Sequence, residues 1–368
     1  MKKKTIENLT IGCFAAFIGI FGIWNAWAPK AEVSYNENRT LAKAPELSVS
    51  HIFSGKFDDD FETWFSDHFV HRDAWIELKS GVKRAALAIE NNNVYYAGEH
   101  RLIGTFQDVN QKNLESNIEQ VSTFAKNNDI KINILLVPTA AWGAETDLPG
   151  GAWNVDQEAL LNQISQKFPD QNFVNFTKHT DPSPSMYFHT DHHWNESGAY
   201  MGYAAICRNV LNKDPNRFTY TLASNSFEGT MYSRSGAFWT KPDSIYTITP
   251  ESGEQNVTVN YDNEHTENSL YSKDRLNEKD KYTYYVDGNH AYVDIRTDVT
   301  NGRKALLIKD SYSHILIPFL ATEYSEIELV DLRYYHSPVS DLLKDDQDVY
   351  VLYSLDNFCS DMNLAFLR

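Results

Sequence analysis

The sequence predicts an α/β fold in which a mostly parallel sheet lies between two layers of helices, with an antiparallel β insertion and one N-terminal transmembrane helix. Short apolar segments alternate with amphipathic helical segments over 114–137 and again over 305–353, which is typical of parallel α/β folds. A stretch rich in Thr, Tyr, Ser, Asn and Asp separates them at about 220–300. A long apolar run follows three lysines at the start of the chain.

The N-terminal segment predicts a membrane anchor. Three lysines precede an apolar run over Leu9–Trp27, which as a helix would span ~28 Å, close to the hydrocarbon thickness of a bilayer. The positive flank should stay in the cytoplasm, so the rest of the chain lies outside. We expect a cytoplasmic tail over 1–8 and an uncleaved signal-anchor over 9–28. A cleaved signal peptide stays open, because residues 26–28 read Ala-Trp-Ala.

Residues 29–55 show no sustained periodicity and predict a linker, so one folded domain is expected over 56–368. Aromatic residues at helical spacing over 57–69 predict an amphipathic helix whose aromatic stripe faces the core. The pattern recurs in a second helix over 114–125. The apolar run at 132–137 then predicts a buried strand.

The C-terminal third continues the alternation of strands and helices. The expected elements are strands at 305–308, 327–330 and 349–353, a helix at about 313–321 and a short helix at 339–344. This order implies right-handed crossovers and an open sheet. Alternating segments in the insertion predict antiparallel strands at Val257–Tyr261, Tyr282–Val286 and Tyr292–Ile295.

Composition and charge exclude one class of partner. The chain has 33 basic and 50 acidic residues, a net charge of −17, so it should repel phosphate backbones and not bind nucleic acid. Aromatic residues at 13% suit a deep core and also sugar-facing clefts. Cys207 and Cys359 lie outside the apolar run and form no C-x-x-C motif. Both a disulfide and two free thiols stay open.

The first candidate constellation is Asp191 and His193. At positions i and i+2 of an extended segment their side chains can point the same way. The carboxylate can then hold one ring nitrogen while the other faces a substrate, as a general base requires. Asn195 is the expected N-cap of a helix over 197–211. The alternative is a helix-capping Asp beside surface histidines.

The second constellation is Ser311, which follows the predicted strand 305–308 and precedes a helix. A serine at such a turn lies at the carboxyl edge of the sheet, where α/β folds bind ligands. The N–H of Ser311 or Tyr312, at the helix N-terminus, would bind an oxyanion. An ordinary N-cap is the alternative. Together with Asp191 and His193, Ser311 predicts an acyl-transferring triad that works through an acyl-enzyme.

A metal site is the other interpretation of the histidines. His189, Asp191, His192 and His193 are dense in zinc-type ligands. Adjacent histidines in an extended strand point to opposite faces, however, and no His-x-x-x-His pair on a helix supports them. We therefore expect no metal and no cofactor, and keep a metallohydrolase as an alternative.

The segment Tyr187–Trp194, followed by Gly198-Ala199-Tyr200, resembles the signature of the DHHW protein family. That family is similar to the SGNH-hydrolase-like domains of alginate O-acetyltransferases. The resemblance covers about residues 35–335. The further matching segments are Glu37-Asn38-Arg39 with Pro45, Phe61–Asp73, Val137-Pro138-Thr139, Gly229–Ser233 and Lys309–Tyr312.

The resemblance implies an SGNH-like α/β sandwich that transfers acetyl groups to or from polysaccharide hydroxyls, with the triad Asp191, His193 and Ser311. A membrane-bound acyltransferase often supplies the acyl group, so such a partner is expected besides a polysaccharide or cell-wall glycan. Candidate oxyanion or substrate-binding residues are Tyr312, His192, Thr139 and Trp194. Two departures are Ala140, where relatives often carry Lys, and the absence of a Gly just before Ser311.

Three alternatives to an extracytoplasmic, membrane-anchored serine enzyme stay open. The first is a non-catalytic relative that binds envelope glycans by stacking on Trp142, Trp153, Trp194 or Tyr312. The second is the metallohydrolase, and the third is a structural envelope protein.

Overall fold

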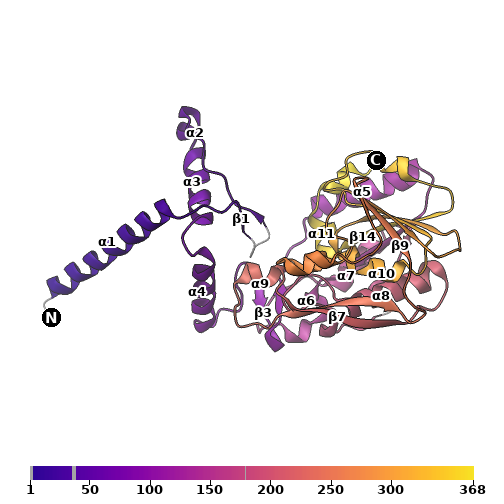
Figure 1. Cartoon of the computed structure of the whole chain (residues 1–368), viewed down its shortest axis with the longest axis horizontal. Helices are drawn as coiled ribbons and strands as arrows, with labels where there is room; N and C mark the ends of the chain where they lie inside the picture. Colours follow the sequence, from indigo (N-terminus) through magenta and orange to yellow (C-terminus); the bar gives the residue numbers. More distant parts are fainter. Residues whose placement is uncertain (1–2, 35–38, 179) are drawn as a thin grey trace. The chain divides into compact units, whose positions relative to one another are not determined.

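The computed structural model describes residues 3–34, 39–178 and 180–368. Glu37 and Asn38, which belong to one segment matching the DHHW family, lie outside the described residues. The chain divides into two compact units, a small one that contains the N-terminal helix and a larger one (Figure 1). Ser311 and Asp191 both belong to the larger unit.

The small unit comprises Met1–Leu87 with Gly236–Phe238. Its elements are α1 (Lys3–Trp27), β1 (Val33–Ser34), β2 (Arg39–Thr40), α2 (Val49–Ser54), α3 (Lys56–Asp67) and α4 (Arg72–Ala85). Among the described residues α1 is the one helix long and apolar enough to cross a membrane, over Lys4–Trp27. This property fits a membrane anchor and a signal sequence alike.

The aromatic stripe of α3 differs from the expectation. Phe61 is 43% exposed and Phe65 37% exposed, so the stripe does not face a core along its whole length. The rings pack mainly on one another, with centroids 6.1 Å apart for Phe57 and Phe61 and 5.9 Å apart for Phe61 and Phe65. Helical spacing alone identified the helix but not what covers its face.

The larger unit, Ala88–Ser235 with Trp239–Arg368, contains a mixed sheet with eight strands in the described chain. In spatial order they are β10 (His265–Glu267), β9 (Val257–Tyr261), β11 (Tyr292–Thr297), β13 (Glu326–Val330), β12 (Lys304–Lys309), β14 (Gln347–Ser354), β5 (Ile132–Val137) and β6 (Asn172–Phe173). Neighbours from β13 to β6 run parallel, whereas neighbours from β10 to β13 run antiparallel. The expected parallel arrangement therefore holds for the five strands from β13 to β6 and not for the sheet as a whole.

The predicted insertion does not form a body of its own. β9, β10 and β11 extend the antiparallel half of the main sheet, and β7 (Phe218–Phe227) pairs with β8 (Asp243–Pro250) in a separate antiparallel ribbon. The strand expected at Tyr282–Val286 is wrong, because a short 3-10 helix, η7 (Lys281–Tyr284), occupies it. The chain then turns through positive φ angles at Val286 (46°) and Asp287 (56°), which an extended strand excludes.

Helices cover both faces of the main sheet (Figure 1). The remaining strands of the larger unit are β3 (Val94–Tyr96) and β4 (Leu102–Gly104). Its α-helices are α5 (Gln111–Asn127), α6 (Ala140–Gly143), α7 (Gln157–Ser165), α8 (Glu196–Ile206), α9 (Thr230–Ser235), α10 (Ile317–Leu320) and α11 (Leu355–Ser360). A short π-helix, η5 (Cys207–Leu211), continues α8. The other 3-10 helices are η1 (Gly98–His100), η2 (Glu145–Asp147), η3 (Phe176–Lys178), η4 (Pro184–Met186), η6 (Lys273–Asn277), η8 (Ser311–Leu316), η9 (Val339–Leu342) and η10 (Asn363–Phe366).

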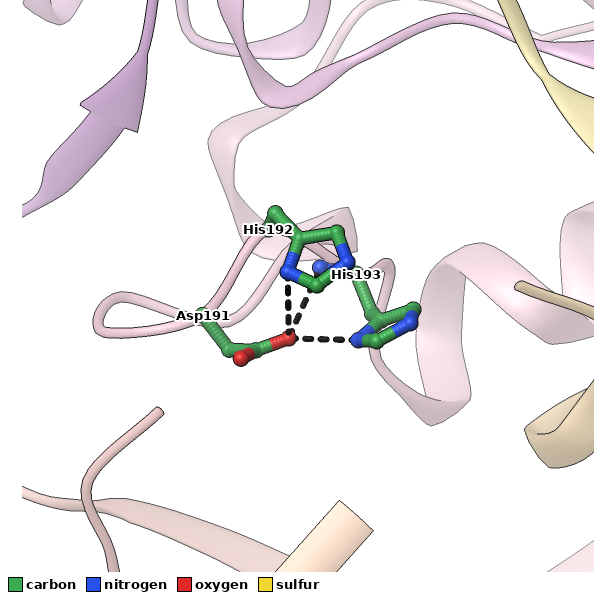
Figure 2. A group of neighbouring side chains, drawn as sticks. All are labelled: Asp191, His192 and His193. Atoms are coloured by element: carbon green, nitrogen blue, oxygen red, sulfur yellow. Dashed lines mark hydrogen bonds and ion pairs between the residues drawn. The ribbon is translucent and has the colours of Figure 1, made fainter. Parts of the chain in front are cut away.

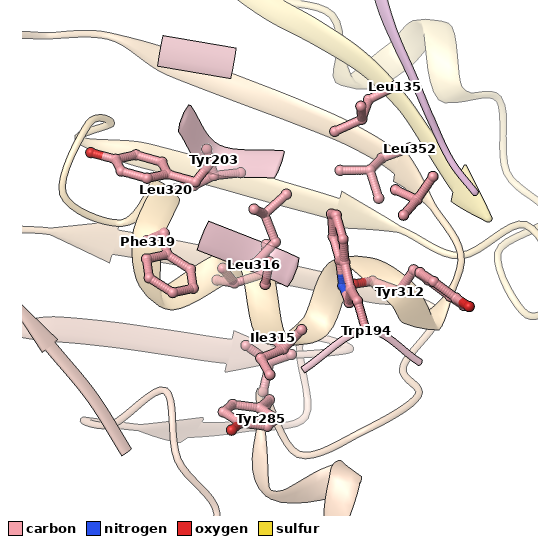
Figure 3. Packing of buried hydrophobic residues seen from close by; sticks show 14 of the residues in the cluster. Leu135, Trp194, Tyr203, Tyr285, Tyr312, Ile315, Leu316, Phe319, Leu320 and Leu352 are labelled. Atoms are coloured by element: carbon pink, nitrogen blue, oxygen red, sulfur yellow. The ribbon is translucent and has the colours of Figure 1, made fainter. Parts of the chain in front are cut away.

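The parallel strands are buried on both faces, and alternate side chains enter two separate cores. Leu135 and Leu307 belong to one cluster, which also contains Trp194 and Tyr312 and of which Figure 3 shows a part. Ile134 and Ile308 belong to the other. Cys207 lies in the first cluster and Cys359 in the second, so the sheet separates them and both are free thiols.

The topology places three segments on one edge of the sheet. β12, β14 and β5 are adjacent and parallel, so their carboxyl ends lie side by side. Ser311 follows β12, Ser354 ends β14, and Thr139 follows β5. Open α/β sheets bind their ligands at this edge.

The close contact between α8 and Trp194 yields a stability prediction. A Cβ at Gly202 would lie 2.5 Å from Cη2 of Trp194, a ring that is fully buried. Gly→Ala in a helix normally stabilises by about 1 kcal/mol, but Gly202→Ala should lower the free energy of unfolding by about 1–3 kcal/mol through overpacking. Denaturant unfolding measures this. Ser197→Ala, at an exposed site of α8, is the control, and equal stability of the two variants would contradict the contact.

Candidate active site

The turn that carries Ser311 is fixed by the buried carboxylate of Asp310. One oxygen of Asp310 accepts the N–H of Tyr312 at 3.0 Å. The other accepts the N–H and hydroxyl of Ser354, at 2.9 and 3.1 Å, and the amide of Asn357 at 2.9 Å. Asp310 thus ties the end of β12 to the end of β14. Ser311 opens η8 immediately beyond this anchor.

His193 links the two constellations that the sequence singled out. Its Nε2 lies 2.8 Å from Oγ of Ser311, and its Nδ1 lies 2.5 Å from Oδ1 of Asp191. Figure 2 shows the carboxylate of Asp191 facing both histidine rings. Because an ionised carboxylate only accepts, Nδ1 of His193 carries the proton and the unprotonated Nε2 faces the serine hydroxyl. This is the tautomer that a general base for Ser311 needs.

The second oxygen of Asp191 is held by Thr230, at the start of α9. It accepts the N–H of Thr230 at 2.8 Å and its hydroxyl at 3.0 Å. Burial by itself would raise the pKa of Asp191, but the imidazoles of His192 and His193, with the hydrogen bonds from the His193 ring and the Thr230 N–H, bring this pKa well below its usual range. Asp191 therefore stays ionised beside His193.

Tyr282 is a site residue that the sequence did not reveal. Its ring stacks on His193 with centroids 3.8 Å apart and an 8° angle between the planes. Its hydroxyl donates to the carbonyl of Ser311 at 2.9 Å. Burial raises the pKa of Tyr282 well above its usual value, so the hydroxyl keeps its proton. Thr230 was likewise not singled out, although it lies in the matching segment Gly229–Ser233.

The two backbone N–H groups expected to bind an oxyanion, those of Ser311 and Tyr312, differ in whether they already have an acceptor. The N–H of Tyr312 donates to the carboxylate of Asp310, so the expectation that it binds an oxyanion is wrong. The N–H of Ser311 has no acceptor among the described residues. It is a backbone donor that stays available beside the Ser311 hydroxyl.

The other predicted binding residues differ in how far their side chains are exposed. Trp194 is fully buried and donates its indole N–H to the carbonyl of Tyr312 at 2.8 Å, and Tyr312 is itself only 1% exposed. Neither ring can stack on a glycan, so that expectation is wrong for both. Thr139 is 8% exposed, and its hydroxyl accepts a hydrogen bond from the side-chain amide of Gln157. The side chain of His192 is 36% exposed beside the triad and remains a candidate for substrate contact.

The metal alternative finds partial geometric support. Ligand atoms of Asp191, His192 and His193 lie within 4.8 Å of one another, and the two rings are 3.9 Å apart. The expectation that the adjacent histidines point to opposite faces is therefore wrong. The candidate atoms already have partners, however. Nδ1 of His193 binds Asp191, its Nε2 binds Ser311, and Nδ1 of His192 lies 2.6 Å from the Thr230 hydroxyl. This pattern fits a triad better than an ion.

The model of the DHHW protein family matches residues 173–330. The resemblance to the DHHW family is confirmed. This match includes Asp191, His193, Thr230, Tyr282 and Ser311. No curated protein matches the chain in sequence.

Solved structures share the fold. A DHHW family protein from Eubacterium siraeum is 20% identical, covers 76% of this chain and 96% of its own, and superposes with a TM-score of 0.62. Bacillus cereus PatB1, in a structure with a sulfonyl adduct, is 22% identical, covers 73% of this chain and 96% of its own, and has a TM-score of 0.60. At these identities the similarity shows a common α/β fold.

Asp280, next to the site, yields a prediction about pH. Burial, followed by the negative charge of Asp191, raises its pKa to about 6. A carboxyl whose folded pKa lies above its unfolded value destabilises the fold as it ionises. The cost is absent below about pH 4, grows towards pH 6 and persists above it. Asp280→Asn should therefore raise Tm at pH 8 more than at pH 4.5.

Thermal unfolding of the full chain at both pH values checks this expectation. Asp274→Asn, at an exposed carboxylate of η6, is the matched control and should show no such difference. An equal effect of Asp280→Asn at both pH values would contradict the raised pKa.

Proposed function

We propose that this chain is a serine O-acyltransferase or esterase that acts on acetyl groups of an extracytoplasmic polysaccharide. Ser311 is the nucleophile, His193 the general base and Asp191 the group that orients the base. The observation that carries the proposal is the continuous set of contacts from Asp191 through His193 to Oγ of Ser311, at 2.5 and 2.8 Å. These distances lie within hydrogen-bond reach, as acid–base catalysis requires.

The proposed first step forms an acyl-enzyme. Nε2 of His193 takes the proton of the Ser311 hydroxyl as Oγ attacks the acetyl carbonyl of the donor. The ionised Asp191 stabilises the resulting imidazolium. The N–H of Ser311 donates to the oxyanion. His193 then returns the proton to the leaving group, and the acetyl group remains on Oγ.

The proposed second step transfers the acetyl group. A glycan hydroxyl, or water in an esterase, gives its proton to Nε2 of His193 and attacks the acyl carbonyl. The bond to Oγ of Ser311 breaks, and Oγ recovers the proton from His193. Both directions use the same residues, so the acceptor that reaches the site determines the outcome.

The proposal includes a location and partners. We assign α1 as an uncleaved signal-anchor, because three lysines precede the apolar run and should remain in the cytoplasm. The larger unit, an SGNH-like domain in this proposal, then faces the envelope and its polysaccharides. A membrane-bound acyltransferase is the proposed source of the acetyl group, and no cofactor is required by these steps.

The nucleophile can be tested directly. With Ser311→Ala, hydrolysis of an acetyl-ester reporter should fall by at least about 10³-fold, because a triad without its nucleophile keeps only residual catalysis. A phenylsulfonyl fluoride should add once to the unmutated full chain in detergent, and peptide mass spectrometry should locate the adduct on Ser311. Ser226→Ala, at an exposed serine of β7, should leave both results unchanged. Labelling elsewhere, or an unchanged rate in folded Ser311→Ala, would remove Ser311 from the mechanism.

Tyr282 should act as a positioning residue. Tyr282→Phe keeps the ring against His193 and loses the bond to the Ser311 carbonyl, so kcat should fall less than about tenfold. Tyr282→Leu loses both contacts and should lower kcat by about 10²-fold, since small misplacements of reacting groups are costly. KM should change little in either variant.

Rates with the reporter and rates of sulfonyl labelling measure both Tyr282 variants. Tyr271→Phe is a matched control, because its hydroxyl also donates to a backbone carbonyl, that of Ile248. It should lose stability without losing kcat. Equal kcat losses in Tyr271→Phe and Tyr282→Leu would reduce Tyr282 to a purely structural role.

A further inference from the structure

A cavity lies on the same edge of the sheet as the triad. It has a volume of about 630 Å³ and is lined by residues of α6, the segment that follows it and the start of α7. These segments follow β5, which is separated from β12 only by β14. At a strand spacing of about 4.8 Å, the carboxyl ends of β5 and β12 are about 10 Å apart. The cavity and Ser311 therefore follow strands that lie two positions apart on one edge of the sheet.

One wall of the cavity is an exposed indole held in a fixed position. Trp153 is 66% exposed. Its indole N–H donates to the carbonyl of Gln107 at 3.1 Å. Its backbone N–H donates to the hydroxyl of Tyr95 at 3.0 Å, and that hydroxyl donates to the carbonyl of Trp153 at 2.9 Å. Burial does not explain this tryptophan, whereas a flat platform for a ligand does.

A second indole connects the cavity to the nucleophile turn. Trp142 also lines the cavity and donates to Glu158 at 3.0 Å. The ring centroids of Trp142 and Phe176 are 5.8 Å apart, and those of Phe176 and Trp194 are 6.0 Å apart. Trp194 in turn hydrogen-bonds the carbonyl of Tyr312. The floor of the cavity and the turn of Ser311 are therefore parts of one packed core.

The charge of the lining limits the ligand. Glu145, Asp156 and Glu158 line the cavity, and its described lining contains no Lys, Arg or His. Carboxylates without a cation repel uronate and phosphate groups and attract amino groups. Asn154 also lines the cavity, and its oxygen accepts the N–H of Phe106. Its buried nitrogen has no hydrogen-bond partner among the described residues, which leaves a donor for a hydroxyl.

From these contacts we propose that the cavity is a subsite for the acceptor glycan, and that it binds a pyranose unit bearing no negative charge, with amino-bearing units preferred. The C–H face of the sugar stacks on Trp153, and hydroxyl or ammonium groups contact the carboxylates and Asn154. This inference rests on the proposed acyl transfer, because it names the acceptor. It excludes polyuronates as the acceptor of this chain.

Binding tests the subsite separately from catalysis. The Ser311→Ala full chain in detergent is titrated with three soluble oligosaccharides of equal length: a glucosamine oligomer, an N-acetylglucosamine oligomer and a galacturonate oligomer. We expect the tightest binding for the first, weaker binding for the second and none for the third. Added Trp153→Ala should weaken binding of the glucosamine oligomer at least tenfold, and Trp153→Phe, which keeps a ring, should weaken it less.

Tyr220→Ala in the same background is the control, because Tyr220 is an exposed aromatic of β7, 41% exposed, that does not line the cavity. It should bind like the parent. Equal binding by Trp153→Ala, or tighter binding of the galacturonate oligomer, would overturn the proposal. Reporter hydrolysis and sulfonyl labelling of the unmutated chain test Ser311 itself, so a failed nucleophile and a failed subsite give different results.

Discussion

The hydrogen bond between His193 and Ser311 joins segments 118 residues apart in the sequence. Neighbouring residues of the larger unit keep these two side chains within hydrogen-bond distance. Asp310, which precedes Ser311, fixes the position of this serine by accepting a hydrogen bond from Ser354 at the end of β14. Thr230 fixes the position of Asp191 by donating its backbone N–H to the carboxylate. Gly229 permits that approach, because a Cβ there would lie 2.3 Å from Cβ of Asp191. Ser311 and Asp191 thus each depend on a neighbouring residue that holds them in place.

The tryptophan of the D-H-H-W element has a structural task. Trp194 donates to the carbonyl of Tyr312 at 2.8 Å, while the hydroxyl of Tyr312 donates to the carbonyl of His192. The two aromatic residues therefore join the loop of His193 to the turn of Ser311 by reciprocal hydrogen bonds. Figure 3 shows both rings packed among Ile315, Leu316 and Leu352. Leaving such buried polar groups unpaired costs free energy. These two hydrogen bonds therefore favour one arrangement of the His193 loop against the Ser311 turn.

The carboxyl edge of the sheet combines two kinds of surface. At β12 the hydroxyl of Ser311 meets an imidazole held by carboxylate and stacked on Tyr282, which suits acyl chemistry. At β5 the cavity presents indoles and carboxylates, which suits an uncharged or amino-bearing sugar. The net charge of −17 agrees with the second surface and disfavours polyanionic substrates.

The sequence by itself determined the strand at 132–137, the strands at 305–308, 327–330 and 349–353, the cap at Asn195, and the segments that hold Asp191, His193 and Ser311. These are local properties, set by periodicity, turn chemistry and motif spacing. Only the tertiary structure decided that Tyr282 stacks on His193, that Trp194 is buried, and that β9 to β11 join the main sheet. Those outcomes depend on which distant surfaces meet in one core. The spacing of residues along a chain does not contain that information.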